Sequence, residues 1–147
     1  MEEVVEKMEE VSQHEYETLA AFRHSIRKFL HFSEQAAREA GLPPRQHQAL
    51  LAIRGAKSNE PLTVGDLANL LVSKPHTVSE LVNRLEMQGL VMKCPGKQDA
   101  RQVVIELTKE GVETLAILTA AHRDELRRLG PVLVKLLSRF SDIKPID

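Results

Sequence analysis

The chain has 147 residues, of which 42% are hydrophobic and 3% aromatic, enough for one packed domain with a mainly aliphatic core. No apolar run approaches the ~18 residues that cross a bilayer. The acidic start of the sequence, Met1-Glu2-Glu3, differs from the basic start of a secretory signal. The single cysteine, Cys94, cannot form an intrachain disulfide or a multi-cysteine metal site. We therefore expect a cytoplasmic protein with no membrane partner, no bound metal and no other cofactor.

The formal net charge of −1 is spread unevenly along the chain. Residues 1–17 contain seven Glu and one Lys, a net charge of −6, so residues 18–147 carry +5. Between positions 74 and 101, five Lys and Arg residues oppose three Asp and Glu residues, which leaves a net charge of +2. A locally basic surface matters more for contact with phosphates than the charge of the whole chain, so this composition is compatible with nucleic-acid binding.

Two helices are predicted in the first part of the chain. Residues 11–40 form a long helix, because apolar residues recur at spacings of three and four, and Gly41 ends it. A second helix begins at Pro43-Pro44, where proline suits the first turn, and it runs to about Ala56 before a polar loop. The residues expected on the apolar faces are Leu19, Phe22, Ile26 and Phe29 in the first helix, and Ala49, Leu50 and Ile53 in the second.

The next segment predicts two helices joined by a tight turn. Thr63 is expected to cap a short helix, with Asp66 completing a capping box. After the turn, Ser73 is expected to cap a longer helix that runs to about Gln88, and Gly89 fits the left-handed position that follows a helix. The apolar positions are Leu67, Leu70 and Leu71 in the short helix, and Val78, Leu81, Val82 and Leu85 in the longer one.

The hydrophobic period then changes from 3.6 to 2, which is typical of strands. Two strands are predicted, at 90–94 and 102–107, on either side of a charged and turn-rich tip at 95–100. The residues expected on one shared face of the second strand are Val103, Ile105 and Leu107.

The last part of the chain predicts a long helix that Thr108 caps. Gly130-Pro131 is expected to break or kink this helix, and a last helix is expected over 132–140. The predicted fold class is therefore mainly α with a small β-hairpin wing, an α+β arrangement of the winged helix-turn-helix type.

The second helix of a helix-turn-helix places its N-terminal half in the major groove of DNA, so it needs one apolar side and one hydrogen-bonding side. The predicted helix after Ser73 has both. Its Ser, Thr, His and Asn residues suit base edges, and its Lys and Arg residues suit phosphates or guanine, whereas the alternative is an ordinary solvated face. The candidate DNA-binding residues here are Ser73, Lys74, His76, Thr77, Ser79, Asn83 and Arg84.

The tip of the predicted hairpin adds Lys97, Asp99 and Arg101 as candidate DNA-binding residues. A charged hairpin beside a recognition helix can lie along the adjacent minor groove, where arginine is favoured because a narrow groove concentrates negative potential. We expect Asp99 to pair with an arginine and to fix the direction of that side chain. The alternative is a surface turn with a weak ion pair.

An ordered set of four motifs resembles the MarR family of bacterial and archaeal transcription regulators. A T-V-S helix start and an R-L-E-x-x-G-L exit lie within 77–91, a D-x-R wing lies at 99–101, and an L-T-x-x-G entry to the long helix lies at 107–111. The resemblance extends upstream to the helix that begins in 42–51, and it covers about residues 15–140.

This resemblance implies a single domain over 1–147 that functions as a homodimer. Residues 11–40 and 109–141 would be dimerisation helices, and 43–107 would be the DNA-binding lobe. The dimer would bind a pseudo-palindromic operator in double-stranded DNA, most commonly as a repressor. By this resemblance, the residues that match recognition-helix positions are Thr77, Ser79, Asn83 and Arg84, and those that match the wing motif are Asp99 and Arg101. Glu80 departs from the family pattern, because many members have a basic or neutral group there.

Many members of the family release DNA when a small anionic aromatic compound binds between the dimer helices and the lobe. An anion needs a cation or an imidazole, so the ligand-binding candidates are His31, Arg45 and His47, each with the alternative of an ordinary polar residue. Two other functions stay open: a metal-sensing regulator, and a dimeric protein-interaction module with weakened DNA binding. An enzyme is not expected, because the sequence has no phosphate-binding glycine loop, nucleophile elbow or zinc-hydrolase motif.

Overall fold

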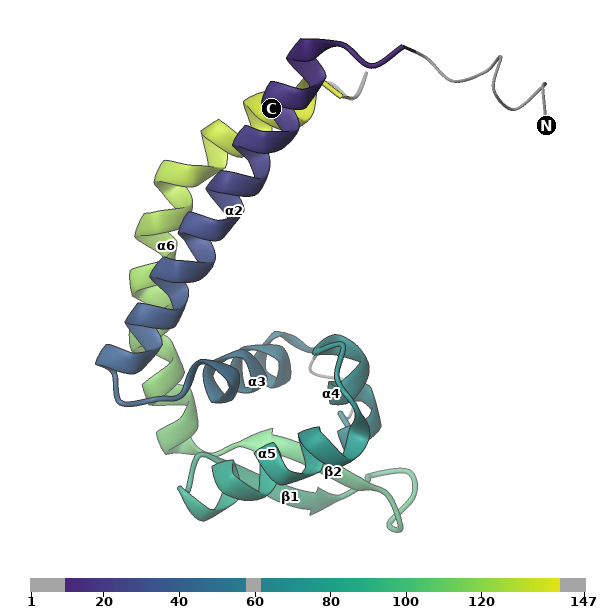
Figure 1. Ribbon diagram of the computed structural model, residues 1–147. Helices are drawn as coiled ribbons and strands as arrows, with labels where there is room; N and C mark the ends of the chain where they lie inside the picture. Colours follow the sequence, from purple (N-terminus) through teal and green to yellow (C-terminus); the bar gives the residue numbers. More distant parts are fainter. Residues whose placement is uncertain (1–9, 58–61, 141–147) are drawn as a thin grey trace, which may run out of the picture. The chain divides into compact units, whose positions relative to one another are not determined.

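The computed structural model describes residues 10–57 and 62–140, which divide into two compact units (Figure 1). The first unit is formed by the two ends of the chain, up to Phe32 and from Arg123 onward. The second unit runs without interruption from Ser33 to His122. The first unit is thus built from segments far apart in the sequence, whereas the second is a continuous stretch.

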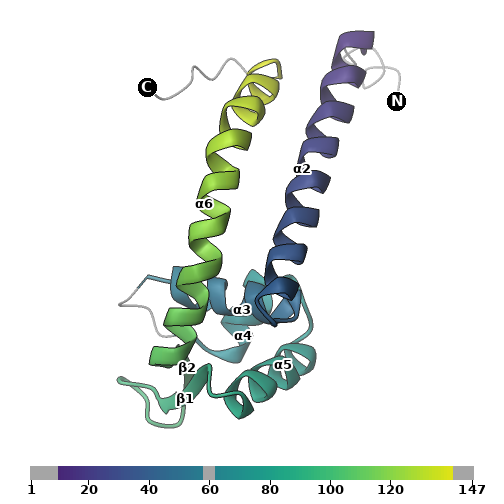
Figure 2. The same cartoon turned by 90° about the vertical axis from the view of Figure 1, so that its left-hand side faces the viewer.

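In the first unit, the start of helix α2 (Gln13–Glu39) and the end of helix α6 (Lys109–Ser138) run antiparallel beside each other (Figures 1 and 2). Arg139, just beyond α6, donates a hydrogen bond from Nη1 to Oγ1 of the buried Thr18 at 3.4 Å. The long helix predicted over 11–40 is confirmed, with its ends shifted by one or two residues.

Helix α6 passes through Pro131 without a break. The predicted interruption at Gly130-Pro131 and the separate helix over 132–140 are therefore wrong. A proline inside a helix removes one N–H donor from the hydrogen-bond ladder. Pro131 lies on an exposed part of α6, where the carbonyl that loses its partner can be solvated, so a single proline leaves the helix continuous.

The second unit contains three shorter helices followed by a β-hairpin, in the order predicted. The helices are α3 (Pro44–Gly55), α4 (Val64–Leu70) and α5 (Pro75–Met87), and the antiparallel strands are β1 (Val91–Pro95) and β2 (Val103–Leu107). A short helix, a tight turn, a longer helix and a hairpin make a winged helix-turn-helix, which confirms the expected fold class.

The core of the second unit is the apolar side of α5, packed with α3, α4 and the hairpin. One expectation about burial is wrong. Leu70 is 58% exposed and Ala68 is buried instead, because the two-turn helix α4 buries only a narrow stripe. In β2, Val103 is exposed while Val104 and Ile105 are both buried, since this strand contacts α3 and α4 as well as β1. The expected core residues that are confirmed as buried are Ala49, Leu50, Ile53, Leu67, Val78, Leu81, Val82 and Leu85.

Local hydrogen bonds determine where α4 and α5 begin. Thr63 and Asp66 form the predicted capping box, in which the Thr63 hydroxyl accepts from the Asp66 N–H at 3.2 Å and the Asp66 carboxylate accepts from the Thr63 N–H at 3.0 Å. Ser73, in contrast, does not cap α5, because the helix begins at Pro75 and Lys74 occupies the N-cap position without a side-chain hydrogen bond. The prediction for Ser73 is wrong by one residue, since the fixed φ of proline suits the first helical position.

A tight junction joins the start of α6 to the turn between α5 and β1. Thr108 caps α6 as predicted: its hydroxyl accepts from the Gly111 N–H at 3.1 Å and donates to the Gly89 carbonyl at 2.6 Å. Gly89 takes the expected left-handed conformation, with φ +75°. A Cβ atom on Gly111 would overlap the carbonyl oxygen of Leu90, so this close approach of two backbones requires glycine.

Candidate nucleic-acid interface

The candidate interface is built on α5, whose apolar residues face the core and whose polar residues face outward. Four buried aliphatic side chains hold the inner side of this helix, so its outer surface has a defined orientation. The predicted site residues in this region are Lys74, His76, Asn83 and Arg84, which are exposed, and Ser73, Thr77 and Ser79, which are half-buried.

One flank of α5 faces the start of α3 across a pocket of about 330 Å³. Thr77, Glu80 and Arg84 line it from α5, and Arg45 lines it from α3. The Glu80 carboxylate therefore shares this pocket with the guanidinium groups of Arg45 and Arg84. Arg45 also donates a hydrogen bond from Nη2 to the Ser73 hydroxyl at 2.9 Å, which joins α3 to the turn before α5.

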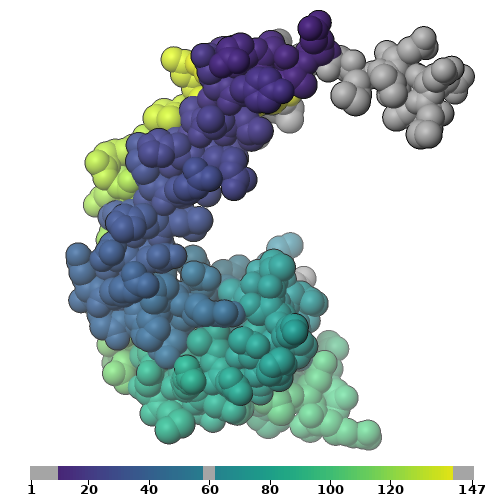
Figure 3. Space-filling view, in the orientation of Figure 1, coloured from purple at the N-terminus to yellow at the C-terminus, as the bar shows by residue number. Residues whose placement is uncertain are grey.

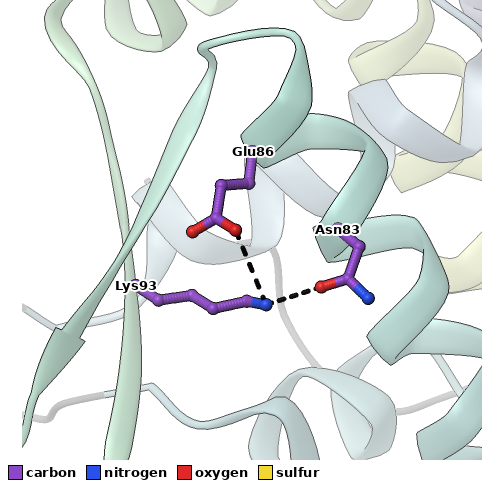
Figure 4. A network of polar contacts seen from close by, with 3 residues as sticks. All are labelled: Asn83, Glu86 and Lys93. Atoms are coloured by element: carbon purple, nitrogen blue, oxygen red, sulfur yellow. Dashed lines mark hydrogen bonds and ion pairs between the residues drawn. The ribbon is translucent and has the colours of Figure 1, made fainter.

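The other flank of α5 faces the hairpin through Lys93, a residue of β1 (Figure 4). The Lys93 ammonium donates to Oδ1 of Asn83 at 2.5 Å and lies 3.6 Å from Oε1 of Glu86. Sequence reasoning counted Lys93 in the local charge but did not name it as a site residue. Its place on β1, the strand that directly follows α5, is the signal that could have indicated it.

The tip of the hairpin is held by its own backbone. The Gly96 N–H donates to the Gln102 carbonyl at 2.8 Å, and Oδ1 of Asp99 accepts from the N–H of Arg101 at 3.0 Å. The recorded hydrogen bond of Asp99 is thus to the backbone of Arg101, so this carboxylate holds the turn rather than the guanidinium that we expected it to fix. Lys97, Asp99 and Arg101 are all exposed, and in Figure 3 the green tip of the hairpin projects beside the teal surface that includes α5.

The three ligand-binding candidates lie in different surroundings. Arg45 borders the pocket beside α5, and His31 is exposed on α2 in the first unit. His47 is buried in α3, with its ring 5.0 Å from the ring of His122. Burial, and after it the nearby charge of His122, lower the pKa of His47 below the usual value for histidine.

His122 links two helices of the second unit, which the sequence did not indicate. Its Nδ1 lies 2.7 Å from the Leu118 carbonyl oxygen and its Nε2 lies 2.7 Å from the Ser33 hydroxyl. A carbonyl can only accept, so Nδ1 donates to Leu118, while the Ser33 hydroxyl, which can donate or accept, lies within hydrogen-bond distance of Nε2. His47, Ser33 and His122 come from α3, α2 and α6, so their meeting depends on tertiary packing.

Three further observations for residues 10–57 and 62–140 concern metal binding, membrane insertion and the cysteine. In these ranges, no three His, Cys, Asp or Glu residues come together in a group that could hold a metal ion. None of the helices in these ranges is long and apolar enough to cross a membrane. The Cys94 thiol lies 3.8 Å from Oε2 of Glu106, and burial, followed by the charge of Glu106, raises the pKa of this thiol.

Comparison with known proteins gives consistent matches. Residues 40–102 match the model of the MarR family. The chain is 31% identical over 90 residues to the transcriptional activatory protein BadR of Rhodopseudomonas palustris, which covers 60% of this chain and 51% of BadR. It is 28% identical over 102 residues to the organic hydroperoxide resistance transcriptional regulator of Bacillus subtilis, which covers 63% of this chain and 67% of that protein. The chain thus spans about half the length of BadR.

A solved structure has the same fold. A mutant of Staphylococcus aureus MepR bound to an oligodeoxyribonucleotide superposes with a TM-score of 0.63 at 23% identity, covering 90% of this chain and 100% of that one. The order of helices and hairpin described above is therefore a known arrangement.

Proposed function

We propose that this chain is a winged helix-turn-helix regulator of the MarR family, whose model matches residues 40–102, and that it binds double-stranded DNA as a homodimer. The observation that carries the proposal is the presence, in one compact unit, of an exposed polar helix face beside an exposed charged hairpin tip. A major groove admits one α-helix, and an adjacent minor groove admits an arginine. The lobe offers α5 for the first and the tip with Arg101 for the second.

Each candidate residue receives a role from its place on this surface. Base edges in the major groove are assigned to the hydrogen-bonding residues of α5, and phosphates to the hydroxyl before α5 and to the cations at its start, at its flank and on the wing. Asp99 is assigned to the shape of the tip, because its carboxylate binds backbone. The base-reading residues are His76, Thr77, Ser79 and Asn83, and the phosphate-binding residues are Ser73, Lys74, Arg84 and Lys97.

The homodimer is supported by the apolar surface of the first unit. Many large apolar side chains there are about half exposed, on the first part of α2 and the last part of α6. An exposed apolar surface of this kind favours association, and a second copy of the same chain is the commonest partner. Two lobes in one dimer would read half-sites about 34–36 Å apart. The exposed apolar residues are Val11, Tyr16, Leu19, Leu30, Leu126, Val132, Val134 and Phe140.

DNA binding is tested by titrating a labelled duplex from the region upstream of the gene at increasing salt. Because cations that contact phosphates release counterions, we expect affinity to fall at least about tenfold between 50 and 200 mM salt. Arg101→Ala should weaken binding to every duplex. Arg127→Ala, which removes an exposed arginine from the first unit, is the matched control and should have little effect. An affinity that does not change with salt would contradict the proposal.

The oligomeric state is tested separately by sedimentation at micromolar concentration. A dimer is expected, since monomers would leave the apolar surface of the first unit in water. A folded monomer at this concentration would overturn the homodimer without excluding DNA binding by a single lobe.

We also propose that a small aromatic carboxylate releases DNA by entering the pocket between α3 and α5. The pocket is bordered by Arg45 and Arg84, which can bind an anion, and by Thr77, which is assigned to base reading. Benzoate is a suitable probe, and DNA affinity should fall by about five- to 150-fold when it binds. Arg45→Gln should abolish this response, whereas His31→Gln and His47→Gln test the two candidates that do not line the pocket. A response unchanged in Arg45→Gln would contradict this site.

The proposed output is repression in the cytoplasm, through a dimer that occupies its own promoter region. A reporter fused to this region should become more active when the gene is deleted. A loss of reporter activity would instead indicate an activator, which is what the name of BadR describes for that protein.

A further inference from the structure

We propose that Lys93 is a positioning residue for Asn83. By holding the Asn83 amide in one orientation, it makes Asn83 select bases that present hydrogen-bond acceptors, guanine above all, rather than adenine. The inference rests on the proposed function and adds a specificity to it. Its basis is a set of three side chains from α5 and β1, in which the Lys93 ammonium lies 2.5 Å from Oδ1 of Asn83 and 3.6 Å from Oε1 of Glu86 (Figure 4).

The ammonium fixes which way the Asn83 amide faces. Lysine has three donors and no acceptor, so only the oxygen end of the amide can bind it. The amide nitrogen then lies on the side away from Lys93, as Figure 4 shows. An exposed asparagine without such a partner can rotate its amide to present either end. Lys93 therefore removes one of the two ways in which Asn83 could meet DNA.

This orientation changes the bases that Asn83 can recognise. Reading adenine takes both ends of the amide, because N6 donates to the oxygen while N7 accepts from the nitrogen. The oxygen of Asn83 is already bound to a cation, whose N–H groups would oppose the N6 amino group of adenine or the N4 amino group of cytosine. The free amide N–H groups suit N7 and O6 of guanine, or O4 of thymine. Lys93 and Asn83 together present donors only, which favours guanine most because it offers two adjacent acceptors.

Glu86 keeps the ammonium in this position. It lies one turn after Asn83 on the same helix, so the carboxylate and the amide oxygen bind the cation from one side of α5. About a third of the Lys93 side chain and rather more of the Glu86 side chain are exposed. An ion pair at this exposure contributes little to folding stability, so loss of Lys93 is expected to act on base preference rather than on the fold.

The test is selection of bound duplexes from a random pool with the unmodified protein and five variants, of which Asn83→Ala identifies the position that Asn83 reads. Lys93→Met keeps most of the side-chain length but has no donor or charge. Lys97→Met removes the same charge from the exposed hairpin tip and is the matched control. Lys93→Arg restores a donor-only cation, and Asn83→Ala combined with Lys93→Met shows whether Lys93 acts through Asn83. A thermal melt of each variant confirms that it is folded.

The result to measure is the ratio of affinities for duplexes with guanine and adenine at the position that loses selectivity in Asn83→Ala. In Lys93→Met this ratio should shift about five- to tenfold toward adenine, while Lys97→Met and Lys93→Arg should keep the ratio of the unmodified protein. In the Asn83→Ala background, Lys93→Met should cause no further shift. A ratio unchanged in Lys93→Met, with binding intact, would overturn this inference alone. No enrichment of any duplex by the unmodified protein would overturn the proposed function and the inference with it.

Discussion

The two units of this chain differ in how their apolar residues are covered. In the second unit, side chains such as Leu50, Val78 and Val82 are fully buried by their own neighbours in the same unit. In the first unit, apolar residues such as Leu19 and Leu126 are about half exposed on α2 and α6. A continuous stretch of about 90 residues can complete a small core, whereas two helix segments cannot.

This difference predicts how the effect of a substitution on stability depends on protein concentration in each unit. A change in the second unit acts on a closed core, so its effect on stability should not depend on protein concentration. A change in the first unit acts on a surface that we propose a second copy covers, so its effect should depend on concentration. The predictions below test this contrast, beginning with the largest expected effect.

Leu50→Ala should lower the free energy of unfolding by about 3 kcal/mol, because it leaves a cavity in the core of the second unit. Leu51→Ala is the matched control, since the neighbouring leucine is 47% exposed, and it should cost less than about 1 kcal/mol. Urea unfolding at two protein concentrations measures both. Equal losses for the two leucines would contradict the closed core.

Gly111→Ala should destabilise the second unit by about 2 kcal/mol, because the new methyl group would overlap the Leu90 carbonyl oxygen. Gly130→Ala is its control in the same helix: the space around that glycine is open within 4 Å, so alanine should stabilise α6 by up to about 1 kcal/mol. Thermal melts of the two variants should shift in opposite directions. A melting temperature that does not fall in Gly111→Ala would show that the junction at Leu90 is looser than described.

Leu126→Asp should weaken dimerisation about tenfold, a change of about 1.4 kcal/mol, because it places a charge on the apolar surface of the first unit. Leu51→Asp puts the same charge at a leucine of equal exposure in the second unit and should leave dimerisation unchanged. Sedimentation over a range of concentrations separates the two. Dimerisation that survives Leu126→Asp would place the dimer contact elsewhere.

Acid should destabilise the second unit through His47. Its folded-state pKa is lowered by burial and by His122, so the unfolded chain binds a proton more readily. The contribution of this group is therefore complete above the unfolded pKa of about 6.5 and is lost as the pH falls toward the lowered value. Unfolding measured between pH 7.5 and 5 should show this loss, which His47→Gln should reduce. His76→Gln, at an exposed histidine, should keep the dependence of the unmodified protein.

Val72→Gly should have the smallest effect, a gain of about 0.5 kcal/mol. Val72 lies in the turn between α4 and α5 with φ +50°, a conformation that costs a β-branched residue more than glycine. Part of that gain is offset because glycine loses more backbone entropy on folding. Its side chain is 92% exposed, so no core contact is lost. A clear loss of stability in a thermal melt would contradict this account of the turn.

Much of the fold could be predicted because it depends on residues three or four positions apart. The capping box of Thr63, the cap at Thr108 and the left-handed Gly89 each follow from a local hydrogen bond or backbone rule. The buried stripe of α5 follows from its period. Local rules were less reliable where two of them competed, as at Ser73 and Pro75, or where solvent could satisfy the backbone, as at Pro131.

The sequence by itself determined the winged helix-turn-helix order, the polar outer face of α5 and the charged tip of the hairpin. Only the tertiary structure decided what those residues touch: Lys93 on Asn83, Arg45 on Ser73, and His122 on Ser33. These partners are 10, 28 and 89 residues apart. Neither periodicity nor local propensity predicts these contacts, because the side chains meet only when the helices have packed. Helix α5 was therefore visible in the sequence, while the lysine that binds its asparagine was not.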